Sequence, residues 1–362
     1  MSLDSYITLG NSGLRVSAFC LGTMTFGDDR GWGSSPSEAH SILASFLDRG
    51  GNFIDTANLY THGHSEKIIG DYFARNGARR QSTVISTKFF CNLQFNDPNG
   101  GGAGRKSIMT QLEHSLRRLQ TEYVDVYWLH LWDKFTPIEE TMRTLDDLVT
   151  SGKVRYIGLS DTPAWKLTQA QMIAQFRGWT PLIALQIEYS LLQRTVEGEL
   201  IPAAKELGLG ITPFAPLKGG LLSGKYTREN VATKKSDRGA FAVTPTEKEF
   251  VVLDQLKVIA DELDTNVAAV ALAWVRSRPG ISSTIIGARR MGQLDANLAA
   301  LDVTLSADQI ASLDALTQPI LNFPADLLKN LSLNLAHAGA TVNGEPSIRL
   351  SSLLPANADE VY

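Results

Sequence analysis

The feature that most constrains the fold is a regular alternation of short apolar stretches with longer amphipathic ones, running from about residue 18 to residue 301. In the amphipathic stretch 37–50, for example, Ile42, Leu43 and Phe46 fall on one helix face. Repeated strand–helix units favour a parallel sheet, and about eight of them fit a closed barrel of this length. The pattern therefore predicts an α/β protein with a (β/α)8 TIM barrel.

The competing fold is a doubly wound open sheet, which would bind a dinucleotide at a G-x-G-x-x-G turn after its first strand. Two glycine-rich stretches come near that pattern, "GWGSSP" at 31–36 and "GGGAGR" at 100–105. Both lack the last glycine, and neither follows a strand directly. We therefore favour the barrel.

The two ends of the chain stand outside the alternation. Residues 6–10 and 14–22 flank the turn "NSG" and predict an N-terminal β-hairpin. We expect residues 1–317 to form a single barrel domain and 318–362 a loop-rich C-terminal extension that could close over the active site. The long loops 24–34 and 91–104 both follow strands, and loops of that length are often functional.

Composition excludes several classes of protein. The net charge is −4, so no basic field attracts nucleic acid. The two cysteines, Cys20 and Cys91, form neither a disulfide framework nor a metal motif, and Cys20 lies in an apolar run typical of a core. No signal peptide and no apolar run of about 20 residues is present. We expect a cytoplasmic protein with no membrane partner and no metal, while its oligomeric state cannot be read.

Polar side chains stand where successive strands end. Asp55 ends the second barrel strand, with Tyr60 just beyond it, Lys88 ends the third and His130 the fourth. Taken alone, each of these residue types is more often a turn residue, a solvated surface residue or a core residue than a catalytic one. A barrel brings its strand ends together at the face where such enzymes do their chemistry. We therefore expect these four side chains to meet.

Together these four residue types suit carbonyl chemistry. A tyrosine is a weak acid at neutral pH, but a nearby ammonium such as Lys88 lowers its pKa by stabilising phenolate. Asp55 can keep Lys88 protonated, and His130 can donate a hydrogen bond to a substrate oxygen. No side chain delivers hydride, so reduction of a carbonyl implies a nicotinamide cofactor.

The motifs that carry these residues resemble the aldo-keto reductases over about residues 6–317. They are "GGNFIDTANLY", "STKF", "VYWLHLWD", "GKVRYIGLSD", "LQIEYSLLQR", "FAPLKGGLLSGKY" and "IIGARRMGQLDANL", in the family's order. The resemblance implies a catalytic tetrad of Asp55, Tyr60, Lys88 and His130, with Tyr60 as the general acid. It also implies NADPH bound in an extended form without a Rossmann domain.

The same resemblance implies a set of cofactor contacts. "LKGGLLSGKY" at 217–226 looks like an ATP-binding loop with Tyr226 in place of Ser or Thr, but in this family it would cross the cofactor pyrophosphate, so no magnesium ligand is needed. Arg289 is the preferred contact for the 2′-phosphate, with Arg290 in reserve, which favours NADPH over NADH. The full set is Gly22, Thr23, Met24, Asp55, Ser160, Asp161, Gln186, Phe214, Ala215, Pro216, Leu217, Gly219, Lys225, Arg238, Gly287, Arg289, Gln293 and Asn297.

Two positions depart from the family, and the substrate is open. Asp161 stands where Asn is usual and Ala215 where Ser is usual, which puts the cofactor preference in doubt. Trp32, Phe90 and Trp132, with Phe323 from the tail, would line a pocket for bulky carbonyl compounds. The function expected is reduction of an aldehyde or ketone, or oxidation of a secondary alcohol. The alternatives are an NADPH-binding regulatory subunit without catalysis, and a lyase with Lys88 as Schiff-base nucleophile.

Overall fold

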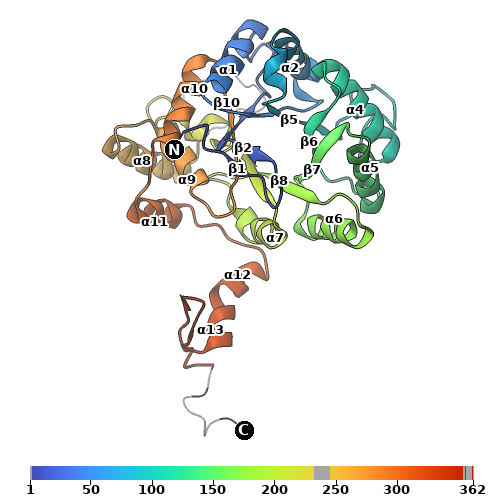
Figure 1. Cartoon of the computed structure of the whole chain (residues 1–362). Helices are drawn as coiled ribbons and strands as arrows, with labels where there is room; N and C mark the ends of the chain where they lie inside the picture. Colours follow the sequence, from blue (N-terminus) through green and yellow to red (C-terminus); the bar gives the residue numbers. More distant parts are fainter. Residues whose placement is uncertain (1, 232–244, 354, 356–360, 362) are drawn as a thin grey trace.

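The computed structural model describes residues 2–231, 245–353, 355 and 361. Within this part of the chain an eight-stranded parallel sheet curls into a nearly closed barrel, each strand beside the next in sequence, which confirms the predicted fold (Figure 1). The barrel strands are β3 Phe19–Gly22, β4 Phe53–Asp55, β5 Val84–Phe89, β6 Val124–Leu129, β7 Val154–Ser160, β8 Leu182–Glu188, β9 Gly210–Phe214 and β10 Thr284–Gly287.

Helices surround this barrel and cover its outer surface (Figure 1). Their apolar faces pack on the outward side chains of the strands, as the periodicity predicted. They are α1 Pro36–Asp48, α2 His64–Arg75, α3 Gly77–Arg80, α4 Arg105–Leu119, α5 Ile138–Thr150, α6 Ala164–Arg177, α7 Leu200–Glu206, α8 Glu247–Glu262, α9 Val267–Arg276, α10 Met291–Leu298 and α11 Ala307–Leu316.

The barrel interior is filled by side chains rather than left open. Cys20, Phe53 and Trp128 are fully buried there, so Cys20 is the core thiol expected. Trp128 fits because Gly158 faces it: a Cβ on Gly158 would lie 2.3 Å from the indole ring. This packing gives the strand ends a rigid support.

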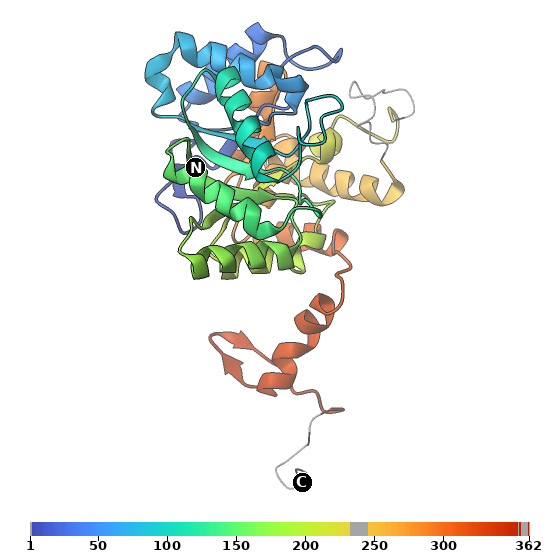
Figure 2. The same ribbon diagram turned by 90° about the vertical axis from the view of Figure 1, so that its right-hand side faces the viewer.

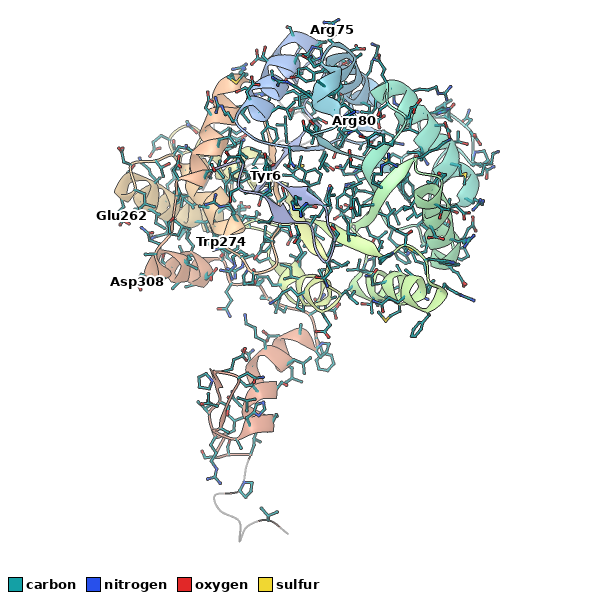
Figure 3. All side chains as sticks on the ribbon, in the orientation of Figure 1. Tyr6, Arg75, Arg80, Glu262, Trp274 and Asp308 are labelled. Carbon is teal, nitrogen blue, oxygen red and sulfur yellow. The ribbon has the colours of Figure 1, made fainter. Side chains whose placement is uncertain are left out.

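The predicted N-terminal hairpin closes one end of the barrel. It consists of β1 Ile7–Thr8 and β2 Arg15–Val16. Leu9 and Val16 are buried in the same cluster as the barrel interior, and Tyr6 donates a hydrogen bond to the Gly50 carbonyl (2.9 Å; Figure 3). The hairpin covers the amino ends of the strands, which leaves the carboxyl ends for the site.

The barrel closes through a short seam between β9 and the segment before β10. Ile211 donates to the Gly280 carbonyl (3.3 Å) and accepts from the Ser282 amide (2.9 Å). Two residues further along β9, on the same side of the strand, stands Pro213, which has no N–H to continue the ladder. The seam is therefore bonded at its amino end and loosely joined toward the carboxyl end.

Helix α11 lies after the last helix that the sequence predicted. It begins at a capping box in which Ser306 and Gln309 exchange hydrogen bonds. Its Asp314 accepts hydrogen bonds from Trp274 on α9 (3.1 Å; labelled in Figure 3), from Arg194 (2.8 Å) and from Arg278 (3.0 Å). These bonds fix α11 to the barrel.

The tail holds more regular structure than the expected loops. After Pro324 it forms α12 Ala325–Leu327, a π-helical turn Leu328–Ser332 and α13 Leu333–His337, then a hairpin of β11 Thr341–Val342 and β12 Glu345–Pro346. Figures 1 and 2 show it projecting away from the barrel beside α7. Its closure over the active site stays a prediction. Among the described residues, no helix combines the length and hydrophobicity of a membrane span.

Candidate active site

Lys88, at the carboxyl end of β5, is the centre of a buried polar cluster. Its side chain has no exposed surface. The ammonium forms an ion pair with Asp55 from β4 and donates to the Thr56 carbonyl (2.8 Å) and to the Tyr60 hydroxyl (3.2 Å). Three of the four expected catalytic side chains are therefore in direct contact, because β4 and β5 are neighbours in the barrel.

Asp55 is held from its other side. Its second carboxylate oxygen accepts hydrogen bonds from the Ser86 hydroxyl (2.7 Å) and from the Gln186 amide (3.2 Å). A carboxylate this deep is stable only when its oxygens are paired. Gln186, expected to contact the cofactor, thus supports Asp55 in this structure.

Tyr60 is placed by an unusual backbone turn. The turn begins at Tyr60, and the next two residues, Thr61 (φ 48°) and His62 (φ 55°), lie in the left-handed region. The Thr61 hydroxyl donates to the Phe26 carbonyl (2.9 Å), which ties the turn to the loop after β3. Such strain is often found at functional sites and here directs the phenol toward Lys88.

The electrostatics of Tyr60 differ from the sequence-based expectation. Burial raises the pKa of Tyr60, and although Lys88 lowers it, the net direction is upward. Burial lowers the pKa of Lys88, but Asp55 and Tyr60 outweigh it, so the net direction is again upward. At neutral pH the cluster therefore holds a protonated phenol beside an ammonium.

His130 completes the cluster as a neutral imidazole. Its ring centroid lies 6.0 Å from that of Tyr60 at an interplanar angle of 81°. Burial, with the charge of Lys88 adding to it, lowers the pKa of His130 to about 3. Its Nδ1 atom is buried and has no hydrogen-bond partner in the part of the chain that the structure describes. A buried ring nitrogen beside a phenol is suited to a hydrogen bond with a ligand.

We expect His130 to make stability depend on pH. Its pKa is lowered on folding, so below about pH 6.5 the unfolded chain binds a proton that the folded chain does not, and stability falls as the pH drops toward 3. Between pH 7 and pH 4, chemical denaturation should show His130→Gln losing about 3 kcal/mol less of its free energy of unfolding than the natural chain. Other titrating groups are common to both proteins. If the two proteins lose the same free energy of unfolding between pH 7 and pH 4, His130 is not a buried neutral imidazole.

A pocket of about 460 Å³ extends from this cluster across the barrel seam. Asp55 and Tyr60 line one end, while Arg289 and Gln293, beside the start of α10, line the other. The predicted cofactor residues that line it are Gly22, Met24, Asp55, Phe214, Ala215, Pro216, Leu217, Gly219, Lys225, Gly287, Arg289, Gln293 and Asn297.

Sequence reasoning missed several residues of the same pocket. Thr25, Gly220, Ser223, Asn266, Ala268, Leu272, Ile285, Ile286, Gly292 and Ala296 also line it. Asn266 could have been found, because "DTN" before an apolar helix is a capping signal and the Asn266 side chain does cap α9. The others are small or apolar and carry no chemical signal of their own.

The loop after β9 is built on left-handed residues that bring a lysine close to its backbone, and the amides of Lys218 and Gly220 donate within the loop, to the carbonyls of Ala215 (2.8 Å) and Leu217 (2.9 Å). Gly219 (φ 63°) and Gly220 (φ 93°) are left-handed, as is Lys218 (φ 46°). Lys218 pairs with Glu188 at the end of β8 (2.6 Å). A Cβ on Gly220 would lie 3.3 Å from the Lys225 ammonium, so glycine leaves this charge room beside the backbone. Backbone and ammonium together suit phosphate oxygens.

The last position of the motif is explained by packing. Tyr226 is 6% exposed and belongs to a second core cluster with Leu221 and Phe250. Lys225, Gly219 and Gly220 therefore line the pocket. Tyr226 packs into the core and fixes the end of the loop.

Other predicted residues lie outside the lining of this pocket. Thr23 and Ser160 are buried, and the Thr23 hydroxyl donates to the Asp55 carbonyl (3.0 Å). Asp161, at the end of β7, remains exposed at the mouth. Partial enclosure together with the charge of Glu188 raises the pKa of Asp161 to about 6. With a pKa of about 6, Asp161 is mostly ionised at neutral pH, so its carboxylate accepts hydrogen bonds and cannot donate one. Arg238 lies outside the described residues.

The predicted substrate residues are half-buried in loops at the carboxyl ends of strands. Trp32 follows β3, Phe90 follows β5 and Trp132 follows β6. Phe90 adopts φ 117°, and its amide donates to the Gln111 side chain (3.0 Å), which holds this strained turn. Phe323 is 83% exposed in the tail. The described residues contain no group of three potential metal-ligating side chains.

Comparison with known proteins identifies the family of this chain. The family model of the aldo/keto reductase family matches residues 18–318. An uncharacterised oxidoreductase of Bacillus subtilis is 39% identical over 318 residues, covering 85% of this chain and 94% of its own. An aryl-alcohol dehydrogenase of Pestalotiopsis microspora is 36% identical over 328 residues (88% and 83%). A probable voltage-gated potassium channel subunit beta of Oryza sativa is 36% identical over 325 residues (86% and 96%). The chain therefore belongs to the aldo/keto reductase family.

Proposed function

We propose that this chain is an NADPH-dependent oxidoreductase that reduces an aldehyde or ketone, with Tyr60 as general acid. The observation that carries the proposal is that the Lys88 ammonium contacts both the Asp55 carboxylate and the Tyr60 hydroxyl. Asp55 and Tyr60 also line a pocket that includes the cationic side chains of Lys225 and Arg289. Relatives named as an oxidoreductase and an aryl-alcohol dehydrogenase support it, and the latter suggests an aromatic carbonyl or alcohol as substrate.

The residues divide the reaction between them. NADPH, when bound in the pocket, would supply the hydride for the carbonyl carbon. Tyr60 donates its proton to the carbonyl oxygen, and Lys88 stabilises the phenolate that remains. His130, neutral at physiological pH, donates a hydrogen bond that orients the carbonyl. Asp55 holds Lys88 in place. Because the pKa of Tyr60 is raised, neutral pH favours reduction, and alcohol oxidation should need a more alkaline medium.

The test is a titration of the purified protein with NADPH and NADH, followed by fluorescence. A panel of aldehydes and ketones is then added and the loss of NADPH absorbance is recorded. Tight NADPH binding with turnover supports the proposal. Absence of binding of either nucleotide would overturn it, and would reopen Lys88 as a Schiff-base residue, to be tested by borohydride trapping. The paired, protonated state of Lys88 argues against that nucleophilic role.

Arg289 should determine the choice between the two nucleotides. We propose that its guanidinium binds the 2′-phosphate, which NADH lacks. Arg289→Ala should raise the Kd for NADPH about tenfold or more and leave that for NADH within about twofold. Arg290→Ala tests the reserve candidate: a selective loss of NADPH affinity in that variant and not in Arg289→Ala would assign the phosphate contact to Arg290. If Arg289→Ala raises the Kd for NADPH and the Kd for NADH equally, Arg289 does not bind the 2′-phosphate.

A second candidate is a regulatory subunit that binds NADPH and turns it over negligibly. The similarity to a probable potassium channel subunit beta favours it. The two candidates differ in one measurement: a regulatory subunit would bind NADPH tightly but oxidise it with no member of the carbonyl panel, and would not reduce NADP+ with alcohols.

A further inference from the structure

Three consecutive strand–helix connections at the carboxyl end of the barrel, the third including the first turn of α6, each carry an exposed aromatic side chain. Phe95 follows β5, Phe135 follows β6 and Trp165 follows β7, and these side chains are 95%, 85% and 60% exposed. The loops lie on the same face as Tyr60 and His130. Exposed aromatic rings on the face that carries the site are candidate ligand contacts, since leaving them in water costs free energy.

Of these residues, Trp165 has the most ordered surroundings. It is the second residue of α6, and its ring meets that of Trp132 edge to face, with centroids 5.6 Å apart at 74°. The Lys166 ammonium lies 4.7 Å from the centre of the same ring. Trp165 nevertheless leaves more than half of its surface open, so the ring is positioned without being covered.

The loop that carries Trp132 is itself held firmly. Asp133 accepts hydrogen bonds from the amides of Ala103 (2.9 Å) and Phe135 (2.9 Å) and from the Thr136 hydroxyl (2.7 Å). Ala103 belongs to the loop after β5, so Asp133 joins two loops of the mouth. A ring fixed before the ligand arrives loses little entropy on binding, as a specificity-determining contact requires.

The strand register connects this tryptophan pair to the catalytic cluster. Leu129 on β6 pairs with Leu159 on β7, so the loops that follow start side by side. His130 opens the first loop, and Trp132 stands two residues after it. A substrate whose carbonyl oxygen meets His130 and Tyr60 can therefore extend its remaining atoms over the tryptophans.

We propose that Trp165, held edge to face by Trp132, is a specificity-determining residue that contacts the fused aromatic rings of the substrate. The inference rests on the proposed function, since it takes the reacting carbonyl to lie at Tyr60. It selects a class of substrate: planar aromatic aldehydes and ketones over small aliphatic ones. Aromatic rings in contact gain more than the burial of their area alone.

The experiment compares 2-naphthaldehyde with butanal, which share the reacting group and differ in the ring. Trp165→Ala should lower kcat/KM for 2-naphthaldehyde about tenfold, mainly through KM, and leave butanal within about twofold. Trp165→Phe should retain most of the activity. Phe176→Ala is the matched control, because Phe176 is an 86% exposed aromatic near the other end of α6. Equal losses with both aldehydes, or no loss with 2-naphthaldehyde, would overturn the inference.

A second readout separates this inference from the proposed function. Calorimetry measures the binding of 2-naphthalenemethanol to the protein in the presence of NADPH, which requires no turnover. Binding about tenfold weaker in Trp165→Ala than in Phe176→Ala supports the contact even if no carbonyl is reduced. If the natural chain reduces butanal but binds 2-naphthalenemethanol no better than Trp165→Ala does, the contact is refuted and the reductase stands.

Discussion

Tyr60→Phe should lower the rate of carbonyl reduction about a thousandfold, because the variant keeps the ring but has no proton to donate. The phenol donates to the carbonyl oxygen only as hydride arrives, so the loss should fall on kcat. Steady-state kinetics with NADPH and an aromatic aldehyde measures it. The Kd for NADPH, followed by fluorescence, should stay within about twofold, since Phe fills the same space.

A residual rate within about tenfold of the natural protein would show that another group delivers the proton. Tyr226→Phe is the matched control: it removes a phenol hydroxyl in the second core cluster, at the end of the loop after β9, and should leave turnover unchanged. Loss of activity in both variants would point to general damage rather than to chemistry at Tyr60.

Lys88→Met should have the largest effect on stability. Removing the ammonium leaves the carboxylate of Asp55 buried without its partner, and breaking such a pair from one side costs about 3–5 kcal/mol. Activity should be lost as well, because Lys88 stabilises the phenolate of Tyr60. Urea-induced unfolding, followed by circular dichroism, gives the free energy of unfolding.

The double variant Asp55→Asn with Lys88→Met separates the two effects. With both charges gone the stability should largely recover, because a neutral buried pair carries no unpaired charge, whereas the activity should not. A single Lys88→Met variant that loses less than about 1 kcal/mol would contradict the buried ion pair.

The fold and the buried polar cluster around Lys88 were predictable for related reasons. The strand–helix period predicts the barrel, and barrel closure brings the strand ends together, so Asp55, Lys88 and His130 could be placed before any distance was known. Helix α11 was not predicted, although Ser306 and Gln309 carry a capping signal, because it follows the last strand–helix unit and so has no place in the period that predicts the barrel.

Properties set by burial could not be predicted. The charge of Lys88 suggested a lowered pKa for Tyr60, but desolvation depends on how many atoms surround the hydroxyl, and it reverses the direction. Gln186 was expected at the cofactor, whereas its side chain reaches Asp55 (3.2 Å). Trp165 was overlooked because sequence does not show which aromatic of a loop stays exposed.

The loosely joined seam between β9 and β10 lies beneath the pocket, whose walls include Phe214 on one side and Ile285 on the other. A ligand that touches both walls would fasten the barrel where Pro213 interrupts the ladder. Hydrogen–deuterium exchange should therefore be fastest at the strand amides flanking this gap and should slow there most on saturation with NADPH. Bound NADPH would then hold β9 and β10 together. Without the cofactor the two strands would separate locally at this seam, and with it they would stay paired.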